Sequence, residues 1–299
     1  MSLSADKQTA SEKILFALLE FEYLTAQQLT TLLYSPGSLT YVRAKLRSLV
    51  AAKLVFALAG KSVGLPTVFT PTAKARAQAS NFLGTSQRKR FRPSEEREKA
   101  DNLFFIKHSL AIRDVLIAAR LLANTTPGIV LNRIYHERDL RRKIYVEIPG
   151  KTAQGKVGKE KICIEPDASC DFIVQQTWRD FFHIEVYRYL PVETLWKQKV
   201  IGLVTYRLTG QHEALFHTSA LSIAVFAQTK AMAQTLKEWT EQALTQLKQQ
   251  TEGQRFFFNT IADPTSAKPA EMYLAPRWQQ AFGSTTTPLL VLKEEDDEK

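Results

Sequence analysis

The chain has 299 residues, an apolar content of 44% and a charged content of 23%, which are ordinary values for a globular protein and leave room for two domains. No run of about 18 uncharged apolar residues occurs, and the first residues lack the features of a signal peptide, so we expect a cytoplasmic protein without a membrane partner. A net charge of +10 and a pI of about 9.5 favour a polyanionic partner.

The first predicted elements are two helices that are separated by a capping motif. Apolar residues recur at helical spacing over residues 11–21, which predicts the first helix. Thr25, with Gln28 three residues later, has the pattern of a capping box and indicates where the second helix begins. Pro36 and Gly37 disfavour continuation, so we expect the second helix to end before them.

A third helix is predicted over residues 38–53, and short strands are predicted near 55–58 and 67–70, with a further helix from about Thr72. The buried face of the third helix is set by apolar residues at i, i+4, i+7 and i+8, which are Val42, Leu46, Leu49 and Val50. The rest of its surface is polar and basic, which leaves that surface available for a partner.

This order of elements is typical of a winged helix-turn-helix: two helices, a turn, a basic helix, and two strands joined by a loop. The last helix of such a motif enters the DNA major groove while the wing contacts the backbone. The predicted DNA-binding residues are Thr40, Tyr41, Arg43, Lys45 and Arg47 on the third helix and Lys61 on the wing. Most contacts of this kind go to phosphate. Packed helices with a solvated basic face, or a module for dimerisation or protein binding, are alternative interpretations of the same pattern.

The next segment, residues 84–101, is polar and basic, contains Gly84 and Pro93, and separates two apolar regions, which predicts a linker. The predicted organisation is a winged-helix DNA-binding domain at 1–83, the linker at 84–101, an α/β domain at 102–290 and an acidic tail at 291–299.

In the C-terminal domain, helices and strands alternate at a spacing that indicates an α/β or α+β layered fold. The predicted helices cover 102–123, 192–208 and 229–250. The predicted strands are one that ends near Glu137 and others within 162–174, 181–187 and 220–227. A basic, flexible loop is predicted at 149–160.

Two carboxylates lie on strands that we expect to be neighbours, Asp167 near the start of one strand and Glu185 within the next. Metal-dependent hydrolysis of a phosphodiester needs carboxylates to hold Mg²⁺ or Mn²⁺, and it usually needs a lysine near the attacking water. Residues two apart on a strand share a face, and the position two after Glu185, where such an enzyme would carry lysine, is Tyr187. An uncharged phenol at this position removes a positive neighbour from the site.

The following helix offers a replacement for the missing charge. Lys197 and Lys199 both lie on it, and a helix lying on the sheet would return an ammonium group to the place left by the tyrosine; Lys199 is the candidate catalytic lysine. Glu137 is a candidate third metal ligand, and His183 shares the strand face of Glu185.

A purely structural interpretation of the two acids is also open. Asp167 follows Pro166, and Pro-Asp is a common turn pair. Glu185 lies between apolar residues of a strand, so if it is buried it needs a partner whatever its function.

Four segments carry a resemblance to a known family: "HSLAIRDVLIAA", "HERDLRR", "IEPDASCDFIV" and "FFHIEVYRYLPVETLWKQKVIGLVTY". They resemble the replication-relaxation family of plasmid and mobile-element proteins, whose members have an N-terminal winged helix, as "YVRAKLRSLVAAKLV" suggests here. The resemblance extends over roughly residues 10–210 and implies DNA binding linked to plasmid replication, DNA relaxation or mobilisation.

The C-terminal part also resembles the restriction-endonuclease-like fold, whose core order is helix, strand, strand, strand, helix, strand. By that likeness, Asp167 and Glu185 match the acidic positions. The replication-relaxation family usually carries E-x-D-R in this region, where this chain has E-V-Y-R. Tyr187 therefore replaces both the acidic residue of that family and the lysine of the nucleases.

We therefore expect a DNA-binding accessory protein of a plasmid or mobile element, whose nuclease-like domain is not catalytic and which needs no cofactor to bind DNA. A DNA endonuclease or nickase that uses Asp167 and Glu185 with Mg²⁺ or Mn²⁺ is the alternative. A winged-helix transcriptional regulator is a further one. The expected partners are double-stranded DNA, replication or mobilisation proteins and, in a homodimer, a second copy of the chain.

Overall fold

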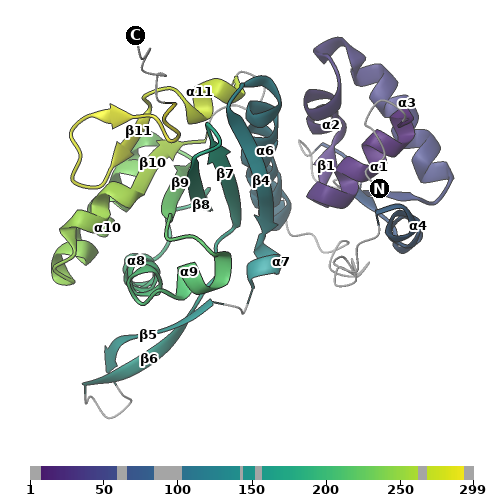
Figure 1. Ribbon diagram of the computed structural model, residues 1–299. Coiled ribbons are helices and arrows are strands. Elements are labelled where there is room, and N and C mark those ends of the chain that lie inside the picture. The colour runs from purple at the N-terminus through teal and green to yellow at the C-terminus, as the bar shows by residue number, and fades with distance from the viewer. Residues whose placement is uncertain are drawn as a thin grey trace, which may run out of the picture. The chain divides into compact units, whose positions relative to one another are not determined.

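The computed structural model of the chain describes residues 8–58, 66–83, 103–141, 144–151, 157–261 and 268–292. The chain divides into two compact units, Met1–Ile117 and Ala118–Lys299 (Figure 1). Both contain helices and strands, which confirms the predicted mixed α/β class. Within the described ranges, no helix is both long enough and apolar enough to cross a membrane.

The N-terminal unit consists of helices and a small antiparallel sheet, close to the bounds predicted from the sequence. Its helices are α1 (Ala10–Phe21), α2 (Ala26–Leu33), the 3-10 helix η2 (Pro36–Ser38), α3 (Leu39–Ala51) and α4 (Ala73–Leu83). Its strands are β1 (Leu24–Thr25), β2 (Val55–Leu58) and β3 (Val68–Pro71), in the order β1-β3-β2. Their core includes the fully buried Ile14, Leu18, Leu29, Val42 and Leu46.

The predicted capping box at the start of α2 is present. The Thr25 hydroxyl accepts a hydrogen bond from the Gln28 amide at 3.1 Å, and the Thr25 amide donates to Gln28 Oε1 at 3.0 Å. Two amides at the helix terminus, which the helix itself leaves without acceptors, are thereby satisfied. This local chemistry sets where α2 begins and hence where α3 lies after the turn.

A long helix, α6 (Leu103–Thr125), contributes its residues up to Ile117 to the N-terminal unit. Arg113 is buried, and its Nε donates to the Phe21 carbonyl at 2.5 Å while its Nη2 lies 3.4 Å from Glu22 Oε2. Gln28 donates to Asp114 at 2.7 Å. A buried guanidinium needs acceptors, and those at the end of α1 hold this part of α6.

This division of the chain differs from the one predicted, which assigned the whole of α6 to the C-terminal domain. The predicted linker at 84–101 lies outside the described residues, as does the predicted acidic tail from residue 293 onward. Sequence periodicity reports where a helix is, but it does not report which unit supplies partners for its polar side chains.

The C-terminal unit is built on a seven-stranded mixed sheet in the order β12-β11-β10-β9-β8-β7-β4. Its strands are β4 (Ile129–His136), β7 (Ala168–Val174), β8 (Trp178–Tyr187), β9 (Ser222–Ala227), β10 (Phe256–Thr260), β11 (Trp278–Gln280) and β12 (Thr286–Thr287). The strands β4, β7 and β8 pair antiparallel, whereas β8, β9 and β10 pair parallel. The helices that follow the sheet strands are α7 (Glu137–Leu140), α8 (Glu193–Leu208), α9 (Gln211–Phe216), α10 (Lys230–Gln246), the 3-10 helix η4 (Gln250–Arg255) and α11 (Pro269–Tyr273).

Helices α8 and α10 share one hydrophobic core with the sheet. Trp196 and Val200 of α8, Leu236 of α10, and Val225 and Phe258 of the sheet are all buried in this core. The helix α8 follows β8 directly and returns along the sheet before the parallel strand β9, as a crossover between parallel strands must. The side chains that face α8 from β8 are therefore covered by it.

The prediction of a basic, flexible loop at 149–160 is wrong in part. Strands β5 (Ile144–Lys151) and β6 (Val157–Ile164) form a two-stranded antiparallel hairpin there. The prediction weighed the glycines and lysines and overlooked the alternation of Ile144, Val146 and Ile148, whose side chains are buried on one face of β5. The strand predicted within 162–174, with Asp167 near its start, is β7, and the residues up to Ile164 belong to β6.

Removing the capping hydroxyl tests the account of α2. We expect Thr25→Ala to lower the free energy of unfolding by about 1 kcal/mol, because the Gln28 amide loses the side-chain oxygen that accepts its hydrogen bond. The measurement is urea denaturation of the full chain. Thr31→Ala, at an exposed position of the same helix, is the control and should change stability by less than about 0.5 kcal/mol. Equal effects of the two substitutions would contradict the capping role.

Candidate functional site

The two predicted carboxylates lie opposite each other where β7 and β8 begin to separate. In the β7–β8 register Ala168 pairs with Ile184, so the preceding residue Asp167 lies across from the following residue Glu185. The Asp167 amide donates to the Ile184 carbonyl at 3.1 Å, and Asp167 Oδ2 accepts from the Val186 amide at 2.7 Å. The strand pairing thus brings together the two acids that the sequence singled out.

Lys199 of α8 completes the group. Its Nζ lies 2.5 Å from Glu185 Oε2, and it also donates to the Glu165 carbonyl at 3.3 Å. The Glu185 side chain is 1% exposed and that of Lys199 is 22% exposed, so the carboxylate is buried and the lysine is only partly exposed. The helix lying on the sheet returns an ammonium group to the position that we predicted.

The electrostatics of the group couple four side chains. Burial lowers the pKa of Lys199, but Glu185, Tyr187 and Asp167 raise it by more, so the net pKa lies above its ordinary value of 10.5. Burial and the charges of Glu185 and Asp167 raise the pKa of Tyr187 above 10.0, against an opposing effect of Lys199. Near neutral pH the site therefore holds an ammonium and a protonated phenol beside two carboxyl groups.

The other candidate lysine is placed elsewhere. Lys197 donates to Glu193 at 2.5 Å and to Gln242 of α10 at 2.6 Å, so it faces α10. Residues two apart on a helix point about 200° apart, so Lys197 and Lys199 cannot both face the strand. Of the two, Lys199 alone enters the candidate site.

Tyr187, which stands at the position of the expected lysine, makes an aromatic contact. Its ring packs edge-on against Trp196 of α8, with ring centroids 5.3 Å apart. An aromatic contact of this kind stabilises the β8–α8 interface. The charge that the sequence position lacks is supplied from α8, and the phenol forms one wall of the site.

Glu137, the third candidate ligand, is the first residue of α7. The described residues contain no group of three or more His, Cys, Asp or Glu side chains that could hold a metal ion, so Glu137 does not join Asp167 and Glu185 in such a group. Two carboxylates are still a suitable donor set for Mg²⁺ or Mn²⁺, because Mg²⁺ commonly takes one or two carboxylates and completes its coordination with water and substrate phosphate.

A buried polar group that the sequence analysis largely missed lies next to Glu185 on the same face of β8. Ser169 Oγ and His183 Nδ1 share a hydrogen bond of 2.6 Å, and both residues are fully buried. The His183 ring lies 6.2 Å from the Tyr206 ring and 5.9 Å from the His212 ring. Burial first, then His212 and Lys199, hold the pKa of His183 well below 6.5, so it is neutral.

A second missed group lies further along β7. Asp171 is fully buried and accepts from Arg179 at 2.8 and 2.9 Å and from Asn132 at 2.6 Å. The signal that could have found both groups is the alternation of Asp167, Ser169 and Asp171, which places polar residues on one face of β7 at a period of two.

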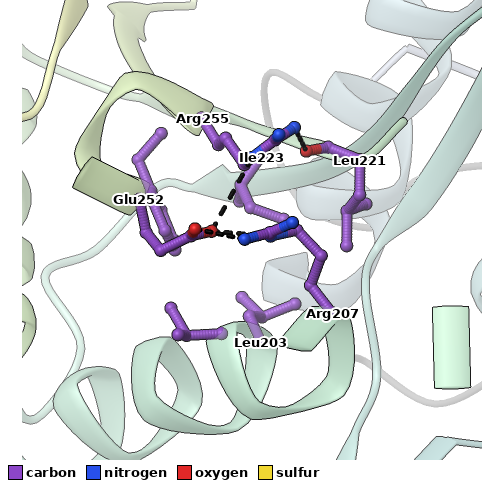
Figure 2. Close-up of a pocket in the computed structure, with 8 residues that line it drawn as sticks. Leu203, Arg207, Leu221, Ile223, Glu252 and Arg255 are labelled. Carbon is purple, nitrogen blue, oxygen red and sulfur yellow. Dashed lines mark hydrogen bonds and ion pairs between the residues drawn. The ribbon is translucent and has the colours of Figure 1, made fainter. Parts of the chain in front are cut away.

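A further charged cluster joins α8 to η4. Glu252 accepts from Arg207 Nε at 2.6 Å and from its Nη2, and Arg255 Nε lies 3.7 Å from Glu252 (Figure 2). Arg255 also donates to the Leu221 carbonyl at 3.2 Å. The cavity beside these groups has a volume of about 10 Å³, about that needed by one water molecule. The cluster thus joins two elements and leaves no room for a ligand.

The predicted DNA-binding residues of the N-terminal unit lie on one side of α3. Thr40, Arg43 and Arg47 are exposed, Tyr41 is 46% exposed, and Lys45 Nζ lies 5.4 Å from the centre of the Tyr41 ring. The wing residue Lys61 lies outside the described residues.

The comparisons with known proteins add no relative. No family model, no curated protein and no solved structure matches the chain.

The neutral buried histidines make stability depend on pH. His212 donates from Nε2 to the Ala220 carbonyl at 2.9 Å, and burial lowers its pKa from 6.5 to about 4. Between these pH values, the unfolded chain binds a proton on His212 that the folded chain does not bind. Stability is therefore lost as pH falls from 6.5 to about 4, by at most about 1.4 kcal/mol per pH unit for this residue.

Urea denaturation across that pH range, compared between the wild type and His212→Gln, measures this effect. The glutamine amide keeps a donor near the Nε2 position but does not titrate, so the variant should lose less stability on acidification. Parallel curves for the two proteins would show that His212 is not neutral in the folded state.

Proposed function

We propose that the protein is a metal-dependent DNA endonuclease that is held on duplex DNA by its N-terminal unit. The observation that carries the proposal is the contact of Lys199 with Glu185 beside Asp167, at 2.5 Å, because metal-dependent phosphodiester hydrolysis needs carboxylates and usually a lysine near the attacking water. Three elements, the start of β7, the end of β8 and α8, supply these residues.

Asp167 and Glu185 would hold Mg²⁺ or Mn²⁺ in this proposal. The bound ion would polarise the scissile phosphate and lower the pKa of a bound water. Lys199, whose pKa is raised, stays protonated and stabilises negative charge that develops on the phosphate. The Tyr187 phenol remains protonated and can donate a hydrogen bond to the same group.

The order of elements supports a nuclease-like fold for the C-terminal unit. Without the β5–β6 hairpin and the short helices α7 and α9, the chain runs through α6, β4, β7, β8, α8 and β9, which is the helix-strand-strand-strand-helix-strand order of restriction-endonuclease-like proteins. The antiparallel β4–β7–β8 set followed by the parallel β9 supports the same likeness. We propose further that the chain is similar to the replication-relaxation family and acts in replication, DNA relaxation or mobilisation of a plasmid or mobile element.

The N-terminal unit supports DNA binding through a winged helix. Helices α1, α2 and α3 precede the strands β2 and β3, and α3 presents its basic side to solvent. We propose that α3 enters the major groove and that Arg43 and Arg47 contact phosphate or base edges.

One observation favours a second function, a DNA-binding accessory protein without catalysis. Glu185 is already neutralised by Lys199, and the nuclease lysine two residues further along β8 is replaced by Tyr187. In a protein that has lost metal binding, such an ion pair would keep the buried carboxylate satisfied. The cleavage experiment below separates the two functions.

Nicking of supercoiled plasmid with Mg²⁺ or Mn²⁺ tests the endonuclease. We expect Asp167→Asn to lower the nicking rate by at least about 10–100-fold, because it removes a charged metal ligand and losses of this size follow the removal of groups that only support such a ligand. The double variant Glu185→Gln with Lys199→Met should do the same, and because it removes both charges together it avoids an unpaired buried ion.

Lys197→Met is the matched control, because it removes the other lysine of α8 and should leave nicking unchanged. Circular dichroism of each variant establishes that it is folded. Nicking that persists in both site variants would refute this site, and wild-type protein that binds duplex DNA without nicking it under either metal would favour the accessory function.

The salt dependence of duplex binding tests α3. Arg43→Ala with Arg47→Ala should reduce the slope of log K against log[salt] by about 0.9 for each phosphate that the variant no longer neutralises. The control is Lys230→Ala with Lys237→Ala on α10, which removes the same charge elsewhere and should leave the slope unchanged. Unchanged affinity and slope in the α3 variant would show that this helix does not bind DNA.

A further inference from the structure

The β5–β6 hairpin forms a sheet of its own. Among the described strands, neither β5 nor β6 pairs with any strand of the seven-stranded sheet. The hairpin is inserted between β4 and β7, and in Figure 1 it runs from beside α8 away from the large sheet. The β4–β7 ladder forms without it, so the hairpin is an addition to the C-terminal unit and requires an explanation of its own.

The hairpin is firmly held at its base, as a two-stranded ribbon alone would be only marginally stable. Its inner face carries the buried Ile144, Val146 and Ile148, which belong to the same core as α8. Gly202 of α8 allows close approach, because a Cβ there would overlap Ile162 Cδ1. The ribbon therefore projects from α8 as a defined structure.

The outer face of the hairpin is basic and aromatic. Lys159 and Lys161 of β6 are exposed on this face, and the described strands of the hairpin carry two acids, Glu147 and Glu160. Lys161 Nζ lies 4.8 Å from the centre of the Tyr145 ring, and Tyr145 is 38% exposed. Lys159 pairs with Glu147 at 3.1 Å, which neutralises one of the two acids while the Lys159 side chain stays 77% exposed.

Both ends of the hairpin lie at the candidate site. Glu165 follows β6, and its carbonyl accepts from Lys199 at 3.3 Å. Arg141, shortly before β5, has its Nε 4.0 Å from the Glu165 carboxylate. A polyanion that reaches Lys199 therefore passes the base of a basic ribbon.

We propose that the β5–β6 hairpin is a DNA-binding arm of the C-terminal unit, which lies along the duplex next to the phosphodiester at Glu185 and Lys199. A two-stranded ribbon fits the major groove of B-DNA, and the outward lysines supply phosphate contacts while Tyr145 supplies an aromatic face. The choice of DNA as the partner of the arm rests on the proposed function. The contact of the arm with DNA can nevertheless be measured without cleavage.

Photo-crosslinking of the full-length protein to duplex DNA in the absence of divalent metal tests the arm. A benzoylphenylalanine residue at position 145, in place of Tyr145, should crosslink to DNA. The same residue in place of Trp178, which is 41% exposed at the opposite end of β8 from Glu185, is the control and should not crosslink. Equal crosslinking at the two positions, or protein–protein instead of protein–DNA crosslinks at position 145, would overturn the proposal.

A charge-removal variant gives a second readout. Lys159→Ala with Lys161→Ala should lower the salt slope of duplex binding by about 0.9 for each lysine that contacts a phosphate, about 1.8 in all, whereas Lys230→Ala with Lys237→Ala should not. An unchanged slope would refute the arm. Crosslinking at position 145 without any plasmid nicking would support the arm and contradict the endonuclease. Plasmid nicking without such crosslinking would support the endonuclease and contradict the arm.

Discussion

The ion pair between Glu185 and Lys199 is the constraint on which the C-terminal unit depends. A carboxylate that is 1% exposed on a central strand must have a counter-charge, and α8 supplies it at 2.5 Å. Removing one partner of such a pair typically costs about 3–5 kcal/mol, a large part of the stability of a whole domain. The pair fixes α8 against the end of β8, and with it Tyr187 and the base of the β5–β6 hairpin.

Polar residues continue from this pair along the covered face of the sheet. Ser169, His183 and Asp171 are fully buried, and the hydrogen bonds of Ser169 with His183 and of Asp171 with the partly exposed Arg179 offset the cost of burying them. An apolar layer would pack at less cost in the same place. Perturbed titratable groups cluster at functional sites and also in structural ion-pair networks, and the proposed endonuclease rests on the first interpretation of this cluster.

Local patterns were sufficient for much of the fold. The alternation and capping signals of the first third predicted α1, α2, α3 and the strands β2 and β3 nearly to their bounds, because helix and strand periodicity and the Thr25–Gln28 box act over a few residues. The β5–β6 hairpin was missed, because its glycines and lysines are typical of a loop. Its buried isoleucines pack against α8, which is distant in sequence. The attachment of Arg113 to the end of α1 was missed for a similar reason, as its acceptors are distant in sequence.

The sequence alone determined which residue types were available to the candidate site: Asp167, Glu185 and a lysine in α8, with Tyr187 in place of the usual lysine. Only the tertiary structure decided that Lys199, and not Lys197, reaches Glu185, because the choice depends on which side of α8 faces the sheet. It also decided that Glu137 does not join the two acids in a group of three among the described residues. The physical reason is that a site made of side chains from separate strands and a helix is set by strand register and helix rotation, which are fixed by packing across the whole core.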